Sequence, residues 1–308
     1  MKLWQLLRFH PTIWVKGILM GMADLIPGVS GGTVALITGI YEKLIFSIGA
    51  IGKNSLTCLW KGRIACFWNR INGNFLLSLG AGILTSVLLF SKLITFLLQH
   101  FPIPLWSFFS GLILASIIFI LKESGKIRLS SIPFFIIGAA SAYWVTSLAP
   151  EHHSPSRLFI FLSGAIASTA MILPGISGSY ILVILGMYAY ILNAVNQRRF
   201  AVLLIFSSGV VGGLLLFSRF LKWLFAHHPH ITLFTLAGFM AGSLNKVWPW
   251  KKILKTATVN GKEMVLESLN IAPWHYEDNP QFLWAVTMFL TGMLLVFVLE
   301  KTTENEEK

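Results

Sequence analysis

Two short segments of the chain carry residue types that bind an anionic group: PGVSGGT at 27–33, the first motif, and PGISGSY at 174–180, the second motif. In each, a proline and a glycine permit a sharp turn, and the following serine is a good N-cap for a new helix. The first N–H groups of that helix lack partners within it, and the helix dipole adds positive charge there. The pattern predicts a phosphate site, although small residues also let helices simply pack closely.

The candidate substrate-binding residues supply the turn, the N–H groups or a hydroxyl in the two motifs. They are Pro27, Gly28, Ser30, Gly31, Gly32 and Thr33, with Pro174, Gly175, Ser177, Gly178, Ser179 and Tyr180. We expect Ser30 and Thr33 to cap the helix that follows the first motif. We also expect the two helix tips to meet inside the protein, one from each half of the chain.

Three charged residues in apolar surroundings are further candidates. Lys92 and Arg219 interrupt apolar runs, where a cation is costly and often functional, and we expect them to draw an anionic headgroup in. The alternative is that both side chains snorkel to the membrane interface. Asp24 precedes the first motif and is either a proton carrier or a cap or ion-pair partner within the fold.

No cofactor and no metal site are expected. The chain has two cysteines, Cys58 and Cys66, in a basic stretch that offers no other metal-ligand residues. We therefore expect isolated reduced thiols there, not a metal centre. The same low cysteine count excludes a secreted scaffold held together by disulfides.

The composition places these residues in a membrane protein. Of 308 residues, 55% are hydrophobic and 12% are charged, and the mean hydropathy is +0.73, whereas a soluble domain has about 25% charged residues. The net charge is +12, but the cations are spread between apolar runs and do not gather on one face. This pattern is typical of membrane orientation, and it disfavours nucleic acid as a partner.

Six apolar runs are long enough, or nearly so, to span a bilayer as helices. They are 75–99, 105–121, 131–149, 200–224, 231–245 and 281–299, of which 231–245 is short. Two further apolar regions, 12–51 and 158–195, are each broken in the middle by a motif. A backbone break inside a membrane is tolerated only where protein or a polar cavity satisfies the freed groups. We therefore expect an all-α polytopic membrane protein with its polar centre at the breaks.

The chain consists of two homologous halves, 1–150 and 151–308. Gly17–Ile45 aligns with Gly164–Leu192 at a shift of 147 positions, which superposes the two motifs. Gly82–Ser116 aligns with Gly209–Ser243 at a shift of 127, with LLFSK over LLFSR. The two shifts differ because the first half contains an extra loop around 53–70. Each half thus holds one broken segment followed by about three spans.

Basic residues predict the orientation. They flank 12–51 on both sides, so both ends favour the cytoplasm and the segment forms a re-entrant hairpin with arms of about 15 residues. Three crossings follow, and an odd number inverts the second half, whose hairpin is 158–195. Inversion leaves Arg198, Arg199 and the cations at 246–262 outside the cell, against the usual preference of basic residues. In the alternative, each broken segment crosses the membrane once, these cations lie inside, and the repeats are parallel. We favour inverted repeats.

Residues 248–280 form the one sizeable polar stretch, and we expect them to be an extramembrane cap. Within this stretch, Asn260 and Gly261 separate two short runs with β propensity. An Asn-Gly pair in that setting predicts a β-hairpin with a type I′ turn.

The residues resemble a known family. The segments GMADLIPGVSGGTVALITGIYEKLI and AMILPGISGSYILVILGMYAYIL, and the tail NIAPWHYEDNPQFLWAVTMFLTGMLLVFVLE, are similar to polyprenyl-phosphate translocases of the PopT type. The resemblance covers nearly the whole chain. It implies a transporter, not an enzyme, that returns undecaprenyl phosphate from the outer to the cytoplasmic leaflet of a prokaryotic cytoplasmic membrane for envelope polysaccharide synthesis. It also implies that the motifs bind the phosphate and that the partners are this lipid and membrane lipids.

Membrane undecaprenyl-diphosphate phosphatases of the BacA type are the alternative. They also have inverted repeats with re-entrant hairpins and a similar Pro-Gly-x-Ser motif, but their motif continues with Arg and Ser beside paired Glu residues. Here Ser30 and Ser177 are each followed by glycine, and Asp24 is the single acid nearby. Hydrolysis needs stabilised phosphate charge and an activated water, so the sequence favours transport. A small-anion channel is a third alternative, but no span carries a row of polar residues.

Overall fold

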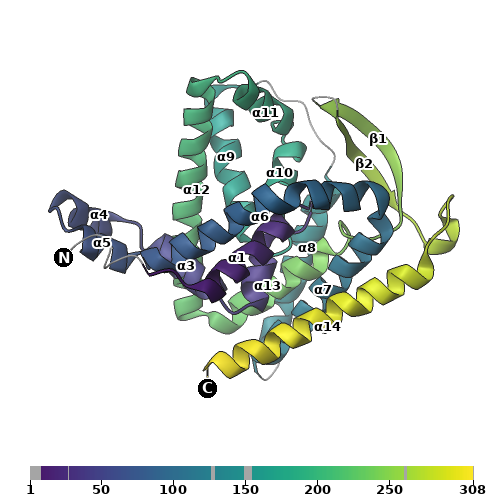
Figure 1. Cartoon of the computed structure of the whole chain (residues 1–308), viewed down its shortest axis with the longest axis horizontal. Helices are drawn as coiled ribbons and strands as arrows, with labels where there is room; N and C mark the ends of the chain where they lie inside the picture. The colour runs from purple at the N-terminus through teal and green to yellow at the C-terminus, as the bar shows by residue number, and fades with distance from the viewer. Residues whose placement is uncertain (1–7, 27, 126–128, 149–154, 260–261, 308) are drawn as a thin grey trace.

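A computed structural model describes residues 8–26, 28–125, 129–148, 155–259 and 262–307, without the side chains of 255–267 and 302–307. In these segments the chain forms fourteen α-helices and one two-stranded antiparallel sheet (Figure 1). The helices make one interlocked bundle, and the sheet stands at its side. Pro27 of the first motif lies outside the described residues.

Five helices in the described segments are long and apolar enough to cross a membrane. They are α6 (Gly73–His100), α7 (Pro102–Glu123), α8 (Ile132–Ser147) with the 3-10 turn Leu129–Ser131, α12 (Phe200–His227) and α14 (Phe282–Glu307), which is apolar to Lys301. Large apolar side chains lie exposed on them: Leu88 and Leu204 are each 71% exposed and Leu283 is 78% exposed. Contact of such apolar faces with lipid is favourable, whereas their exposure to water is unfavourable. The prediction of a helical polytopic membrane protein is confirmed.

The short predicted span at 231–245 is a buried helix, α13 (Pro229–Ser243). Leu236 and Met240 on this helix are almost inaccessible, because α13 packs against both α7 and α8. At 1.5 Å per residue its length is about 22 Å, less than the roughly 30 Å of a bilayer core. Neighbouring helices, not lipid, therefore surround most of α13.

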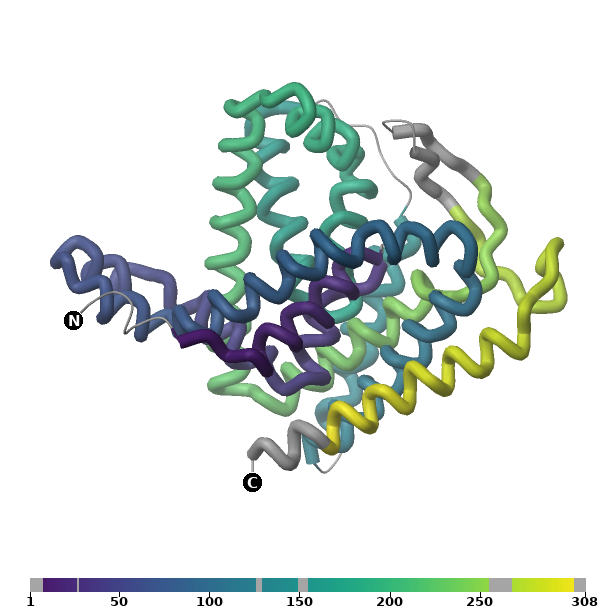
Figure 2. The backbone as a smooth tube through the Cα atoms, in the orientation of Figure 1, coloured from purple at the N-terminus to yellow at the C-terminus, as the bar shows by residue number. Residues whose placement is uncertain are grey.

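The two halves contain the same succession of helices. In the first half α1 (Pro11–Asp24), α2 (Gly31–Ile37) and α3 (Tyr41–Gly49) correspond to α9 (Arg157–Ile172), α10 (Gly178–Ile184) and α11 (Tyr188–Asn196) in the second. The bounds of α2 and α3 lie 147 positions before those of α10 and α11, and the bounds of α6 lie 127 positions before those of α12. Figure 2 lets the reader follow this succession twice along the chain. The helix order thus repeats as the sequence alignment predicts.

The broken segments differ from the predicted hairpins in the second arm. The first arm is one helix in each half, but the second arm is two short helices, bent by 116° between α2 and α3 and by 106° between α10 and α11. The second arm, expected as one arm of about 15 residues, is divided because Gly39 and Gly186 adopt positive φ, 70° and 65°, and end the preceding short helix. Ser30 is the N-cap of α2, whereas Thr33, also expected as a cap, lies inside that helix.

Equivalent glycines pack the two halves into each other. Gly111 of α7 faces α14, where a Cβ atom would come within 2.0 Å of the Phe289 carbonyl oxygen. Its repeat counterpart, Gly238 of α13, faces α8, where a Cβ atom would come within 2.2 Å of the Phe135 carbonyl oxygen. A first-half helix therefore packs on the last helix of the second half, and a second-half helix packs on the last helix of the first. This exchange holds the motifs of both halves in one bundle.

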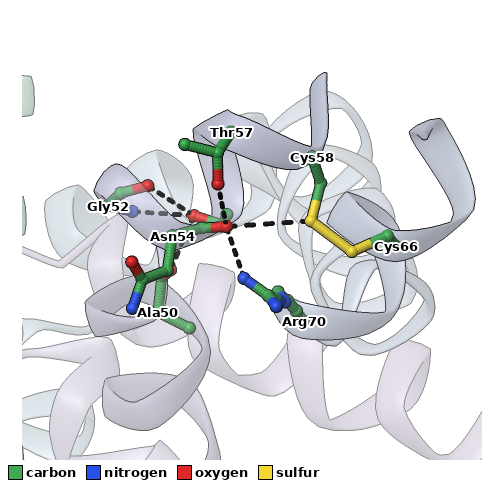
Figure 3. Close-up of a disulfide and its surroundings, with 8 residues drawn as sticks. Ala50, Gly52, Asn54, Thr57, Cys58, Cys66 and Arg70 are labelled. Atoms are coloured by element: carbon green, nitrogen blue, oxygen red, sulfur yellow. Dashed lines mark hydrogen bonds between the residues drawn. A yellow bond between two sulfur atoms is a disulfide. The ribbon is translucent and has the colours of Figure 1, made fainter. Parts of the chain in front are cut away.

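The extra stretch of the first half folds into two short helices, α4 (Lys53–Trp60) and α5 (Ile64–Arg70), that project from the bundle in Figure 1. The turn between them brings the Cα atoms of Cys58 and Cys66 to 5.8 Å, and the two sulfurs form a disulfide (Figure 3). The expectation of isolated reduced thiols is wrong, because a helical hairpin sets these two positions side by side. In the same cluster the Asn54 carbonyl accepts hydrogen bonds from Thr57 and Arg70.

A β-hairpin follows α13. Strand β1 (Lys251–Val259) pairs antiparallel with β2 (Lys262–Asn270), and Val259 lies opposite Lys262. The predicted hairpin is confirmed, although its turn residues lie outside the described segments. The Trp250 indole N–H donates to the Pro280 carbonyl at 2.9 Å, and the Trp250 ring stacks on Phe282. These contacts tie the beginning of β1 to the beginning of α14.

Candidate functional site

The two motifs contact each other directly, although 147 positions separate them. The Ser30 hydroxyl lies 3.2 Å from the Met171 carbonyl oxygen and 3.1 Å from the Leu173 carbonyl oxygen, to which it donates. In return, the Gly175 N–H donates to the Thr33 hydroxyl at 3.0 Å. Ser30 and Thr33 are almost fully buried, so these bonds form in a setting of low dielectric, where they are strong. The helix tips of both halves therefore share one polar centre.

The tip of α2 is already occupied by protein groups. The Gly31 N–H donates to a carboxylate oxygen of Asp24 at 2.7 Å, and the Gly32 N–H donates to the Ser30 hydroxyl at 3.1 Å. The Thr33 N–H donates to the Ser30 carbonyl at 3.0 Å. A Cβ atom on Gly31 would come within 2.6 Å of the Asp24 carboxylate, so the fit is tight. Asp24 thus supplies the negative charge that a helix N-terminus attracts.

The tip of α10 is open, because Met171 stands where the first half has Asp24. Among the described residues no acceptor takes the N–H groups of Gly178, Ser179 or Tyr180. The hydroxyls of Ser177 and Ser179 lie 2.8 Å apart, and Ser179 is exposed. Unpaired N–H groups and an accessible hydroxyl can receive an anion that enters from outside the bundle.

The turns that lead to both tips need glycine. Gly28 and Gly175 adopt φ of 91° and 87°, which residues with a side chain rarely do. Space is also restricted: a Cβ atom on Gly175 would come within 2.6 Å of the Ser243 hydroxyl, and a Cβ atom on Gly28 within 2.8 Å of the Lys246 side chain. The C-terminal end of α13 therefore packs against both turns.

Two lysines that the sequence analysis did not select lie beside the motifs; we call Lys246 and Lys251 the lysine pair. The Lys246 ammonium is 4.1 Å from the centroid of the Tyr180 ring, on the first turn of α10. The Lys251 ammonium donates to the Lys246 carbonyl and lies 4.8 Å from the centroid of the Trp106 ring. Beyond the aligned segment that ends at Ser243, the same shift of 127 pairs Lys246 with Phe119, so a cation stands where the first half has an apolar residue.

The lysine pair lies outside the spanning helices, in the turn after α13 and at the start of β1, and both side chains are half-buried. Burial lowers the pKa of the Lys246 ammonium to about 8. Burial, together with the positive charge of Lys246, lowers the pKa of the Lys251 ammonium to about 7. Both shifts mean that a charged lysine is costly here until an anion arrives.

A cavity of about 620 Å³ lies at the C-terminal end of α2, the end away from the first motif. It is lined by apolar side chains from α2, α7, α12 and α13 and by four charged residues, Glu42, Lys122, Glu123 and Glu300. Lys122 pairs with Glu300 at 3.5 Å. Tyr41 also lines this carboxylate cavity, and its hydroxyl donates to the Ile172 carbonyl, next to the second motif, at 3.2 Å. The carboxylate cavity therefore connects to the second motif through Tyr41, whereas the lysine pair contacts that motif through Tyr180.

The predicted cations Lys92 and Arg219 lie elsewhere. Both side chains are exposed on the long helices α6 and α12. The Arg219 guanidinium donates to the Ile51 carbonyl at 2.5 Å, at the end of the first broken segment. Neither residue contacts a motif in the described part of the chain, so a role in drawing the headgroup in stays a prediction. Within the same residues, no three His, Cys, Asp or Glu side chains are grouped to hold a metal ion.

Comparison with known proteins places the chain in a family. It is 45% identical over 300 residues to a Vibrio cholerae protein named polyprenyl-phosphate transporter, covering 96% of this chain and 97% of that one. A Staphylococcus aureus protein of the same name is 32% identical over 253 residues, 76% of this chain and 85% of its own. No solved structure matches this chain. The family model described as undecaprenyl phosphate translocase-like matches residues 20–265. The chain therefore belongs to the undecaprenyl phosphate translocase-like family.

Proposed function

We propose that this protein transports a polyprenyl phosphate, specifically undecaprenyl phosphate, across the cytoplasmic membrane of a bacterium. The direction is from the outer to the cytoplasmic leaflet, which returns the lipid carrier for another round of envelope polysaccharide synthesis. The family and the names of two bacterial relatives support the substrate. The observation that carries the proposal is the contact between the two motifs, a polar centre inside a bundle whose outer faces suit lipid.

The geometry suits a phosphate headgroup that enters while its isoprenoid tail stays in lipid. The open tip of α10 offers N–H groups and the Ser179 hydroxyl to the phosphate, and it lies beside the lysine pair. Ser30 and Tyr41 donate to the Leu173 and Ile172 carbonyls just before the second motif, and the Gly175 N–H of that motif donates to the Thr33 hydroxyl. Movement of the phosphate past the motifs requires these bonds to break and re-form. The two halves, as inverted repeats, provide equivalent elements for the opposite state.

A phosphatase would need more than the motifs contain. In the described residues the carboxylate beside the motifs is Asp24, and its oxygen is engaged by the Gly31 N–H. No arginine contacts either motif in those residues. An activated water and a stabilised leaving phosphate would both lack a dedicated group. We therefore propose transport without hydrolysis.

Purified protein in liposomes tests the proposal with two assays on one preparation. The first measures the movement of a fluorescent polyprenyl monophosphate between the two leaflets. The readout is the fraction of fluorescence that a membrane-impermeant quencher, added on one side, removes over time. The second measures inorganic phosphate released from the corresponding diphosphate. We expect leaflet exchange that exceeds protein-free liposomes and no release of phosphate. Phosphate release would favour the enzyme, and absence of exchange would overturn the transporter.

A further inference from the structure

The lysine pair consists of two cations without a carboxylate partner among the residues whose side chains are described. The neighbouring Lys252 shows the contrast, because its ammonium pairs with Glu277 at 2.8 Å on the exposed side of β1. Side chains alternate along a strand, so Lys252 points to solvent while Lys251 turns inward to Trp106 and Lys246. Burial of positive charge without a counter-ion is unfavourable unless an anion completes the site.

Aromatic faces hold these ammonium groups without neutralising them. Tyr180 and Trp106 contribute ring faces at 4.1 Å and 4.8 Å from the two nitrogens. A ring face attracts a cation through its quadrupole but takes none of its charge, so both lysines keep N–H donors for a ligand. The Tyr180 hydroxyl donates to the Thr146 carbonyl at 2.9 Å, which fixes the ring.

The backbone that carries the lysine pair is held in place from several sides. The Ser110 hydroxyl of α7 donates to the Val247 carbonyl at 2.9 Å, next to Lys246. The Ile271 N–H donates to the Trp250 carbonyl at 3.1 Å, next to Lys251. Gly28 leaves room for the Lys246 side chain against the first motif, since a Cβ atom there would overlap it. The pair is therefore positioned before any ligand binds, which lowers the entropic cost of binding.

We infer that Lys246 and Lys251 bind the phosphate headgroup of the transported lipid, as counter-charges that the segment between α13 and β1 places beside the motifs. This inference rests on the proposed function for the identity of the lipid, but the chemistry it names is a phosphate monoester. Such a group carries between one and two negative charges at neutral pH, which two lysines match.

Binding to the purified full-length protein in detergent tests the inference. The probe is a fluorescent short-chain polyprenyl monophosphate, compared with the same prenol without phosphate and with inorganic phosphate as a competitor. We expect Lys246→Gln and Lys251→Gln each to weaken monophosphate binding by about tenfold to over a hundredfold, the range of one charged hydrogen bond. Prenol binding should not change. Lys252→Gln, the matched control, should stay within about twofold of the unsubstituted protein.

The outcomes separate this inference from the proposed function. The decisive protein is the double variant Lys246→Gln, Lys251→Gln. If it elutes and melts normally yet binds the monophosphate with the affinity of the unsubstituted protein, the inference fails while transport stands. If the lipid does not bind, but inorganic phosphate binds and is lost in the lysine variants, the phosphate site stands and the proposed substrate falls. Binding of neither probe overturns the inference. Should Lys246→Gln fold poorly, Lys246→Arg keeps the charge and should retain most of the affinity.

Discussion

The Tyr41 hydroxyl donates a hydrogen bond to the Ile172 carbonyl at 3.2 Å, so the start of α3 in the first half holds the end of α9 in the second half, just before the second motif. Its repeat counterpart, Tyr188, makes no hydrogen bond through its hydroxyl to any described residue. Two positions that are equivalent in the repeat alignment therefore make different contacts in this conformation. That asymmetry is expected of a protein whose halves exchange roles between two states.

Removal of the Tyr41 hydroxyl should weaken the conformation described here. We expect Tyr41→Phe to lower thermal stability in detergent by about 1 kcal/mol, because the buried Ile172 carbonyl loses a hydrogen bond. The rate of leaflet exchange should change as well, since the contact lies between the motifs and the carboxylate cavity. Tyr188→Phe is the matched control and should leave stability unchanged. Equal effects of both substitutions would contradict the assigned asymmetry.

The role of Asp24 can be decided with two substitutions. Because its carboxylate accepts the Gly31 N–H at 2.7 Å, we expect it to act as a cap and not as a proton carrier. Asp24→Asn keeps an acceptor oxygen and should preserve both stability and leaflet exchange. Asp24→Ala removes the acceptor and should cost about 1 kcal/mol of stability. Loss of exchange in Asp24→Asn with normal thermal unfolding would instead assign Asp24 to proton transfer.

The features that the sequence predicted depend on local chemistry and on the repeat. Apolar run lengths give the spans, and the paired motifs at 27–33 and 174–180 give the broken segments and the N-cap Ser30. The bend at Gly39 was missed, because a glycine in an apolar run is compatible with either a helix or a bend until packing decides. The disulfide of Cys58 and Cys66 was missed because it depends on how α4 turns into α5.

The lysine pair shows a different limit of sequence analysis. Lys246 and Lys251 belong to a run of cations at 246–262, which is explained equally well as charge on a surface exposed to water. Their contact with Tyr180 and Trp106 comes from the packing of α13 beside both motifs, which brings together residues far apart in the chain. Lys92, by contrast, matched the pattern of a functional cation, but it lies exposed on α6. Burial cannot be derived from residue type alone.

The exchanged packing of the two halves should be sensitive to one methyl group. Gly111→Ala would place a Cβ atom 2.0 Å from the Phe289 carbonyl oxygen, so α7 and α14 must separate. We expect a loss of about 1–3 kcal/mol, the usual cost of overpacking, measured by thermal unfolding in detergent. Gly238→Ala should act similarly through α8. Gly80→Ala is the control, because no atom of another described helix lies within 4 Å of its new Cβ atom.

Phosphate binding should weaken as the pH rises. The pKa values of about 8 for Lys246 and about 7 for Lys251 mean that both lysines are charged below these values and lose their charge above them. Tyr180 faces Lys246, and Lys246 faces Lys251, so the pair itself dominates the titration. We expect affinity for a polyprenyl monophosphate to fall by about tenfold or more from pH 7 to pH 9 at constant ionic strength.

Two controls accompany the pH series. The double variant Lys246→Gln, Lys251→Gln should show little pH dependence over the same range, because the second ionisation of the phosphate has its midpoint near pH 6 and is largely complete by about pH 7. Binding in the unsubstituted protein should also take up protons above pH 7, which calorimetry in two buffers of different ionisation enthalpy detects. An affinity that rises between pH 7 and pH 9 would contradict the assignment of the lysine pair.

Sidedness of two loops tests whether the repeats are inverted. Lys61 follows α4 and Gln197 follows α11, and both are exposed. The basic residues around α4 favour the cytoplasm, and an inverted second half then puts Gln197 outside. In a background with Cys58→Ser and Cys66→Ser, we expect Gln197→Cys to react with a membrane-impermeant maleimide on intact cells, and Lys61→Cys to react only after the membrane is opened. Reaction of both cysteines from one side would make the repeats parallel. Reaction of Lys61→Cys alone on intact cells would keep the inversion but place the disulfide loop on the oxidising side, which reverses the orientation proposed from the basic residues.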